Sequence, residues 1–104
     1  MTTDWICKHH SDLGKEQLYA ILKLRCEVFI VEQECAYLDI DGQDLEGDTL
    51  HLMGWQNDQL VAYARLLDPE SHAGDVVIGR VIVAPQARGH SLCHDLMDQA
   101  LHNI

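Results

Sequence analysis

A short polar turn joins an apolar run to a helical pattern near the end of the sequence. Residues 76–83 are almost continuously apolar, which predicts a strand covered on both faces, and Pro85 stops this strand. Arg88 and Gly89 make a tight polar turn, after which apolar residues recur at helical spacing from Leu92. A helix that begins at such a turn leaves its first N–H groups unpaired, at the positive end of the helix dipole. The turn therefore predicts a binding site for a phosphate or another anion.

The region between residues 32 and 48 is irregular and acidic, with seven carboxylates and no basic residue. An EF-hand calcium loop is excluded here. Gly42 follows Asp39 and Asp41 too early, and Leu50 stands where the twelfth-position glutamate of such a loop belongs. We expect a solvated loop with short helical turns.

The roles of four further side chains are not decided by the sequence. Arg25 lies on or near the apolar stripe of a predicted helix, so its head group either reaches water or pairs with a carboxylate or a substrate group. His90 and His94 are four residues apart, a spacing that can hold a metal, but we expect surface histidines and no metal site. Cys93, near the start of a helix, is either reactive or packed against the sheet, and packing is the expectation.

The hydrophobic pattern predicts the elements that must position these residues. They are a strand at 5–10, a helix capped by Ser11 or Asp12 and running to about Ile30, the acidic loop, strands at 49–55 and 60–67 joined as a hairpin by a turn at 56–59, a loop at 68–75, the strand at 76–83 and the helix from Leu92. This order predicts an α+β fold. It argues against a doubly wound sheet, in which helices separate successive strands.

The composition restricts the class of protein. With 104 residues the chain is expected to form one small domain. A formal net charge of −10 with only seven lysines and arginines argues against nucleic-acid binding. No apolar run approaches the roughly 20 residues of a membrane helix, and the first residues lack a signal-peptide pattern, so we expect a cytoplasmic protein with no membrane partner. The four cysteines are widely separated, which favours free thiols.

The segment around the polar turn resembles the coenzyme A-binding motif of the GNAT N-acetyltransferase superfamily, V-x-V-x-P-x-x-R-G-x-G-x-G/A. Residues 81–93 read V-I-V-A-P-Q-A-R-G-H-S-L-C. The match is good up to Gly89. Ser91 and Cys93 then stand where the superfamily usually has glycine followed by glycine or alanine, and each added side chain needs room that glycine leaves free.

The resemblance narrows to the ElaA-like family when more of the chain is included. The segments that carry it are RCEVFIVEQECAY at 25–37, DIDGQD at 39–44, HLMGW at 51–55, LVAYAR at 60–65 and IGRVIV at 78–83. It implies the N-terminal part of the GNAT fold, with a mixed, mostly antiparallel sheet and an optional second helix in the acidic loop. Members of the family are longer, so we expect residues 1–104 to be a partial domain without the fifth strand, the following helix and the closing hairpin.

The resemblance implies an acetyltransferase that binds acetyl-CoA and lets an amine of unknown identity attack the thioester directly. The implied cofactor-binding residues are Val81, Ile82, Val83, Arg88, Gly89, His90, Ser91, Leu92 and Cys93. A backbone N–H at Ile82 or its neighbour Val83 would stabilise the oxyanion. Candidate general bases are Glu32, Glu34 and His51, and candidate substrate contacts are Arg25, Glu32 and Gln33.

The same resemblance bears on partners and leaves alternatives open. The acidic loop would form one wall of the acceptor-amine site and lend it negative charge. The exposed edge of the strand at 76–83 would permit a homodimer. One alternative is a non-catalytic module, derived from half of a GNAT domain, that binds coenzyme A or a protein. Another is a metal-binding protein that uses the acidic loop or the histidines.

Overall fold

Four antiparallel strands form the sheet around which the chain is organised. The computed structural model describes residues 2–34, 38–75, 77–89 and 91–104. The elements in chain order are β1 (Asp4–His9), η1 (His10–Asp12), α1 (Lys15–Arg25), η2 (Cys26–Glu32), β2 (Leu50–Gln56), β3 (Gln59–Leu67), η3 (Pro69–His72), β4 (Val77–Val83), η4 (Pro85–Ala87) and α2 (Leu92–His102).

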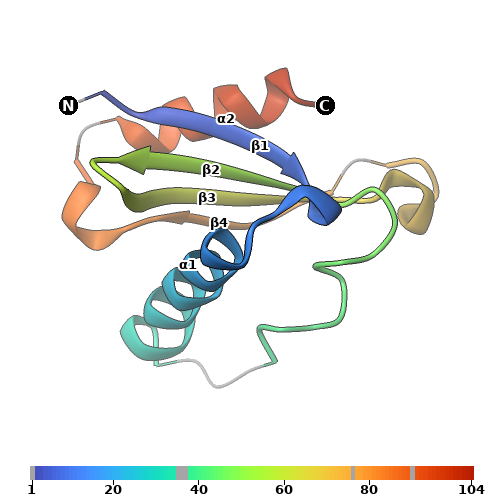
Figure 1. Ribbon diagram of the computed structural model, residues 1–104, viewed down its shortest axis with the longest axis horizontal. Coiled ribbons are helices and arrows are strands. Elements are labelled where there is room, and N and C mark those ends of the chain that lie inside the picture. The colour runs from blue at the N-terminus through green and yellow to red at the C-terminus, as the bar shows by residue number, and fades with distance from the viewer. Residues whose placement is uncertain (1, 35–37, 76, 90) are drawn as a thin grey trace.

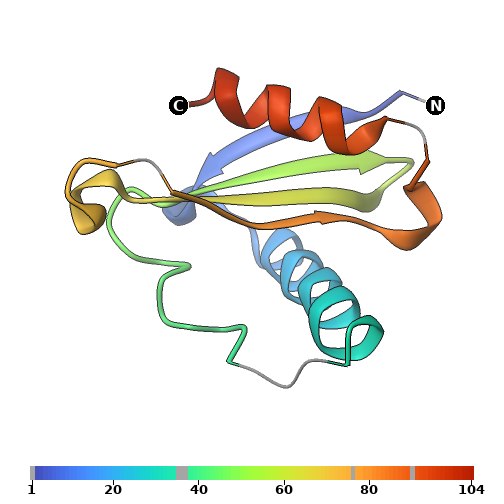
Figure 2. The same ribbon diagram turned by 180° about the vertical axis from the view of Figure 1, so that it is seen from behind.

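The strands lie in the order β1-β2-β3-β4, each pairing with the next in the chain. Figures 1 and 2 show α1 on one face of this sheet and α2 on the other. The predicted α+β class and the predicted order of elements are confirmed. A second helix in the acidic loop is absent from the described part of that loop, residues 38–48, which has neither helix nor strand.

The hairpin between β2 and β3 is set by two turn residues. Asn57 and Asp58 both have positive φ, 49° and 65°, as a two-residue type I′ turn requires. Gln56, the last residue of β2, pairs across the turn with Gln59, the first residue of β3. The predicted hairpin is therefore confirmed, with a turn two residues shorter than the sequence predicts.

Helix α1 differs from its prediction at both ends. Ser11 and Asp12 lie in η1 instead of capping α1, which begins at Lys15 after the N-cap Gly14. The side chain of Gln17 accepts the Gly14 N–H at 2.9 Å and replaces the predicted cap. Beyond Arg25 the helix continues as the wider π-helix η2, whose winding the continuing apolar pattern could not indicate.

Strand β4 is an edge strand rather than the doubly covered strand that its apolar run predicts. Within it only Ile82 is buried, while Val77 is exposed and the other residues are half-buried. Val76, where the predicted strand begins, lies outside the described residues. Strand β3 is instead buried over residues 60–67, because it has a strand on each side and a helix on each face.

The core has two layers, one on each face of the sheet. Helix α1 and η2 contribute Ile21, Leu24 and Val28, and helix α2 contributes Leu92, Leu96 and Ala100. Their spacing of three or four residues places each set on one helical face. The sheet is thus held between two apolar helix stripes.

Replacement of Leu96 by alanine is expected to lower the free energy of unfolding by about 2 to 5 kcal/mol, since the side chain is fully buried and its loss leaves a cavity. The matched control is Leu101→Ala on the same helix, where the side chain is 62% exposed and the expected loss is within about 0.5 kcal/mol. Urea unfolding measures both. Equal losses in the two variants would contradict the packing of α2 described above.

Candidate functional site

A β-bulge lies in the middle of β4. Arg65 of β3 pairs with Gly79, but Tyr63 pairs with Ile82, so Arg80 and Val81 together face the single residue between Tyr63 and Arg65. Arg80 has φ of 52°, an uncommon value for a residue with a side chain. The bulge redirects the end of β4 and turns the Arg80 side chain toward the acidic segment.

The backbone groups of β4 after the bulge point in alternate directions. The Ala84 N–H donates to the Val61 carbonyl of β3 at 2.8 Å. Alternation then directs the backbone groups of Ile82 toward β3 as well, and those of Val83 toward the open edge. The contact of Arg88 Nε with the Val83 carbonyl oxygen, at 3.0 Å, agrees with this direction. Of the two predicted oxyanion donors, Val83 therefore directs its N–H to the open edge, whereas Ile82 directs its N–H toward β3.

The turn after β4 leads directly into helix α2. Gly89 has φ of 90°, which glycine adopts without strain, and Ser91 is left-handed at 58°. The first i to i+4 bond of α2 runs from Asp95 N–H to the Ser91 carbonyl, at 3.2 Å, so the three preceding N–H groups lie before the helical ladder. This arrangement has the unpaired N–H groups on which the predicted anion site depends. His90 of the predicted cofactor site lies outside the described residues.

The side chains of the turn face different surroundings. Leu92 is buried and anchors the start of α2 in the core. Ser91 and Cys93 are exposed, so neither side chain is inserted between helix and sheet. The expectation that Cys93 packs against the sheet is wrong, because the buried stripe of α2 runs through Leu92 and Leu96 instead.

Arg88 and Glu32, predicted for different roles, contact each other. Arg88 Nη1 and Nη2 donate to the two carboxylate oxygens of Glu32 at 3.1 and 2.8 Å. This bidentate pair joins the turn after β4 to the last residue of η2. Gln33 and Glu34, the other candidates nearby in sequence, are exposed. The structure therefore brings one candidate base to the predicted anion site.

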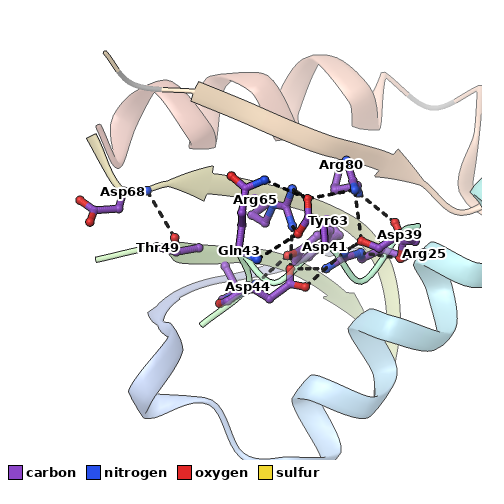
Figure 3. Close-up of polar contacts among 11 residues, drawn as sticks. Arg25, Asp39, Asp41, Gln43, Asp44, Thr49, Tyr63, Arg65, Asp68 and Arg80 are labelled. Atoms are coloured by element: carbon purple, nitrogen blue, oxygen red, sulfur yellow. Dashed lines mark hydrogen bonds and ion pairs between the residues drawn. The ribbon is translucent and has the colours of Figure 1, made fainter. Parts of the chain in front are cut away.

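A buried network of charges ties the acidic segment to the rest of the protein (Figure 3). The Arg25 side chain is 0% exposed, and its Nε donates to Asp39 at 3.0 Å while its Nη1 donates to Asp44. Arg65 binds both carboxylate oxygens of Asp41 at 2.9 Å and also reaches Asp44. Arg80 from the bulge reaches Asp39 at 2.9 Å and Asp41 at 3.2 Å.

This network corrects two predictions. The Arg25 head group does not reach water, because it pairs with carboxylates, and its bonds inside the protein leave it away from an external substrate. The acidic segment is expected from the sequence to be a solvated loop or a negatively charged wall. Its centre is neither, because arginines pair with Asp39, Asp41 and Asp44 and neutralise their charge. Its other carboxylates, those of Glu32, Glu34, Glu46 and Asp48, are exposed.

The ion pairs shift the ionisation of the aspartates. Hydrogen bonds from Arg65 are the largest influence on Asp41 and lower its pKa from 3.8 to about 2. Burial opposes the ionisation of Asp44, but hydrogen bonds and charges from Arg25 and Arg65 outweigh it and lower its pKa. Because both pKa values are lowered in the folded state, the network stabilises the protein above pH 3.8 and is lost as the pH falls toward 2.

His51 lies inside the protein rather than at an exposed site. The Asp44 carbonyl can only accept, so His51 Nε2, 2.8 Å away, carries the proton. His51 Nδ1 then accepts from the Tyr63 hydroxyl at 2.6 Å. Burial lowers the pKa of His51 and raises that of Tyr63. With both ring nitrogens bonded internally, His51 has no lone pair for an external amine, and its prediction as a general base is corrected.

Sequence reasoning missed Tyr63, Arg65 and Arg80 as members of the network. The available signal was a charge inside an apolar strand run, which occurs at Arg65 and Arg80 and calls for a buried partner. The described residues contain no group of three or more histidine, cysteine, aspartate or glutamate side chains arranged to hold a metal. In the same part of the chain, no helix has both the length and the apolar character of a membrane span.

Comparison with known proteins gives consistent results. The family described as Acetyltransferase (GNAT) family matches residues 16–103. Protein ElaA of Escherichia coli strain K12 is 54% identical over 98 residues, which are 94% of this chain and 64% of ElaA. A UPF0039 protein of Synechocystis is 43% identical over 90 residues, 86% of this chain and 57% of that protein. The chain thus spans less than two thirds of the length of these relatives.

Solved structures show the same similarity. The crystal structure of an acyl-CoA N-acyltransferase from Pseudomonas aeruginosa has a TM-score of 0.94 and 58% identity, and the match covers 97% of this chain and 69% of that one. The crystal structure of Escherichia coli ElaA also has a TM-score of 0.94, with 52% identity, covering 98% of this chain and 69% of the other.

Replacement of Arg25 by methionine is expected to lower the free energy of unfolding by about 3 to 5 kcal/mol, because it removes one of the two arginine partners of each of two buried carboxylates. Arg88→Met is the matched control, since its pair is solvent-exposed and its loss is expected to cost no more than about 1 kcal/mol. Denaturant unfolding at pH 7 measures both. Similar costs for the two variants would contradict a buried network.

The buried His51 predicts a pH dependence of stability near neutrality. Its folded pKa lies below the ordinary 6.5, so the unfolded state binds the proton more readily and the free energy of unfolding falls as the pH drops below 6.5. His51→Gln should reduce this slope by up to about 1.4 kcal/mol per pH unit. Parallel curves for the two proteins would contradict the prediction. NMR titration of the wild-type ring gives a check that needs no variant.

Proposed function

The chain belongs to the GNAT acetyltransferase family and has the acyl-CoA N-acyltransferase fold, and on this basis we propose that it transfers an acetyl group from acetyl-CoA to an amine. The observation that carries the proposal is the open edge of β4, which runs through the Arg88 turn into the start of α2. This edge offers free backbone groups that a ligand can pair with, followed directly by the predicted anion site. The two together suit a long ligand with phosphates at one end.

The residues present fit acetyl-CoA, which supplies an acetyl thioester when bound. Val83 presents its backbone N–H and carbonyl to the open edge, where an amide-containing arm can pair as an added strand. The N–H groups at the start of α2 and the Arg88 guanidinium suit the phosphates. The Ser91 and Cys93 side chains are exposed and lie on the solvent side of the turn.

The chain also supplies groups for the reaction itself. The Val83 N–H is the donor placed to stabilise negative charge on an acyl oxygen at the β4 edge. Glu32 is the candidate base nearest the anion site, because it contacts Arg88, while Glu34 is an exposed second candidate. A base is required because an amine is protonated at neutral pH and must lose a proton before it attacks. The acceptor proposed is a small-molecule or peptide amine.

A non-catalytic module that binds coenzyme A is the second candidate. It is favoured by one observation, that Arg88 engages both carboxylate oxygens of Glu32, the candidate base nearest the anion site. A homodimer through the β4 edge stays a prediction. We further propose that the protein works in the cytoplasm, which is supported by the free thiols of Cys7, Cys26 and Cys93.

Calorimetric titration of the 104-residue chain with acetyl-CoA tests the proposal, followed by a screen of small amines for acetyl transfer. Val83→Pro removes the N–H that faces the open edge without removing a bond to β3, and should lower the rate of transfer by at least about 100-fold. Val83→Ala keeps this N–H and serves as the matched control, with a rate close to wild type.

The outcomes separate the two candidates. Binding together with transfer to an amine supports the acetyltransferase, whereas binding without transfer to any amine supports the non-catalytic module. No binding by a sample that is folded by circular dichroism would contradict both. Equal rates for Val83→Pro and Val83→Ala would remove the Val83 N–H from the mechanism.

A further inference from the structure

Every nitrogen of the Arg88 guanidinium is engaged within the protein. Its Nε donates to the Val83 carbonyl oxygen at 3.0 Å, and Nη1 and Nη2 donate to the Glu32 carboxylate at 3.1 and 2.8 Å. A planar guanidinium presents its donors in a fixed fork, and here a carboxylate fills the outer side of that fork. Glu32 thus stands where an external anion would bind Arg88.

The same contacts lie on the edge that the proposed cofactor needs. Val83 presents its carbonyl to the open side of β4, and Arg88 takes this acceptor with Nε. A ligand that pairs with the edge competes for the carbonyl, and a phosphate competes for the fork. We propose, on the basis of the proposed function, that the contacts of Arg88 with Glu32 and with the Val83 carbonyl form a latch. The phosphates of acetyl-CoA must displace Glu32 from Arg88 to open this latch.

The exposure of the latch distinguishes it from the other arginine contacts. The Arg88 and Glu32 side chains are 46% and 37% exposed, whereas the paired side chains of Arg25 and Asp44 are 0% and 9% exposed. An exposed pair exchanges with water and ions at low cost, while a buried pair cannot lose one partner without stranding a charge. The pairs of Arg25, Arg65 and Arg80 are thus buried or largely buried, whereas the pair of Arg88 is exposed enough for an anion to replace Glu32.

Opening of the latch links the binding of acetyl-CoA to the activation of the acceptor amine. While the latch is closed, the Glu32 carboxylate is occupied by Arg88 and its lone pairs are engaged. Once a phosphate takes Arg88, the carboxylate at the end of η2 is free to accept a proton from the amine. Cofactor binding thus precedes activation of the acceptor, and Glu32 serves as the internal competitor that sets this order.

The test is calorimetric titration of the full 104-residue chain with acetyl-CoA at about 0.15 M salt, where charges more than about 8 Å apart are screened. Glu32→Gln should bind acetyl-CoA about three- to fivefold more tightly than wild type, the gain expected when an exposed bidentate ion pair no longer competes. Glu46→Gln is the matched control, because it removes one exposed carboxylate of the same acidic segment outside the latch, and its affinity should equal that of wild type.

Two further measurements make the test specific. Acetylated pantetheine lacks the phosphates and competes with Arg88 only for the Val83 carbonyl, so it should gain less affinity from Glu32→Gln than acetyl-CoA does. In an Arg88→Gln background, Glu32→Gln should leave the affinity for acetyl-CoA unchanged, since the latch is already absent.

The latch is overturned if Glu32→Gln binds acetyl-CoA no more tightly than wild type, or if Glu46→Gln or the phosphate-free compound shows the same gain. These results would leave the acetyl-CoA site itself intact. Absence of acetyl-CoA binding by wild type and by Glu32→Gln, both folded, would instead overturn the proposed function and the latch together.

Discussion

The balance of charge between three arginines and three aspartates is the constraint on which the rest of the structure depends. Arg25, Arg65 and Arg80 come from α1, β3 and β4, and all of them converge on one irregular segment, residues 38–48. A segment without helix or strand has few internal partners for its backbone and can lie on the sheet only if side chains supply them. Arg25 and Arg80 both donate to the Asp39 carbonyl, and His51 donates to that of Asp44. The network therefore fixes the path of the segment as well as neutralising its charge.

Burial makes the stability of this network depend on complete pairing of its charges. Taking several charges out of water is costly, and the cost is offset only when every charge keeps its partners. Because each aspartate contacts two arginines, removal of one side chain disturbs the whole set. Apolar residues of the same volume could fill this space without a desolvation cost. The charged network therefore contributes more to fixing one geometry than to the free energy of unfolding.

The network also reaches the proposed site through one residue. Arg80 is the bulge residue of β4, with a positive φ, and its side chain holds Asp39 and Asp41. The bulge sets which backbone groups of the strand face outward, so the charge network and the exposed edge share a structural element. The ion pair that follows the bulge differs from those of the network. The contact between Arg88 and Glu32 is exposed to solvent, so its partners can exchange.

The sequence by itself determined the elements whose causes are local. The turn between β2 and β3, the strand–turn–helix from β4 to α2 and the α+β order follow from periodicity and turn residues within short windows. Only the tertiary structure decided that β4 is an edge, that Val83 rather than Ile82 faces outward, that His51 is bonded on both nitrogens, and that Arg25 meets Asp39. These features depend on strand register, where one residue reverses the direction of a backbone group, and on partners 7 to 41 residues apart in the chain. A local pattern shows that a buried charge needs a partner, but the fold alone selects which one.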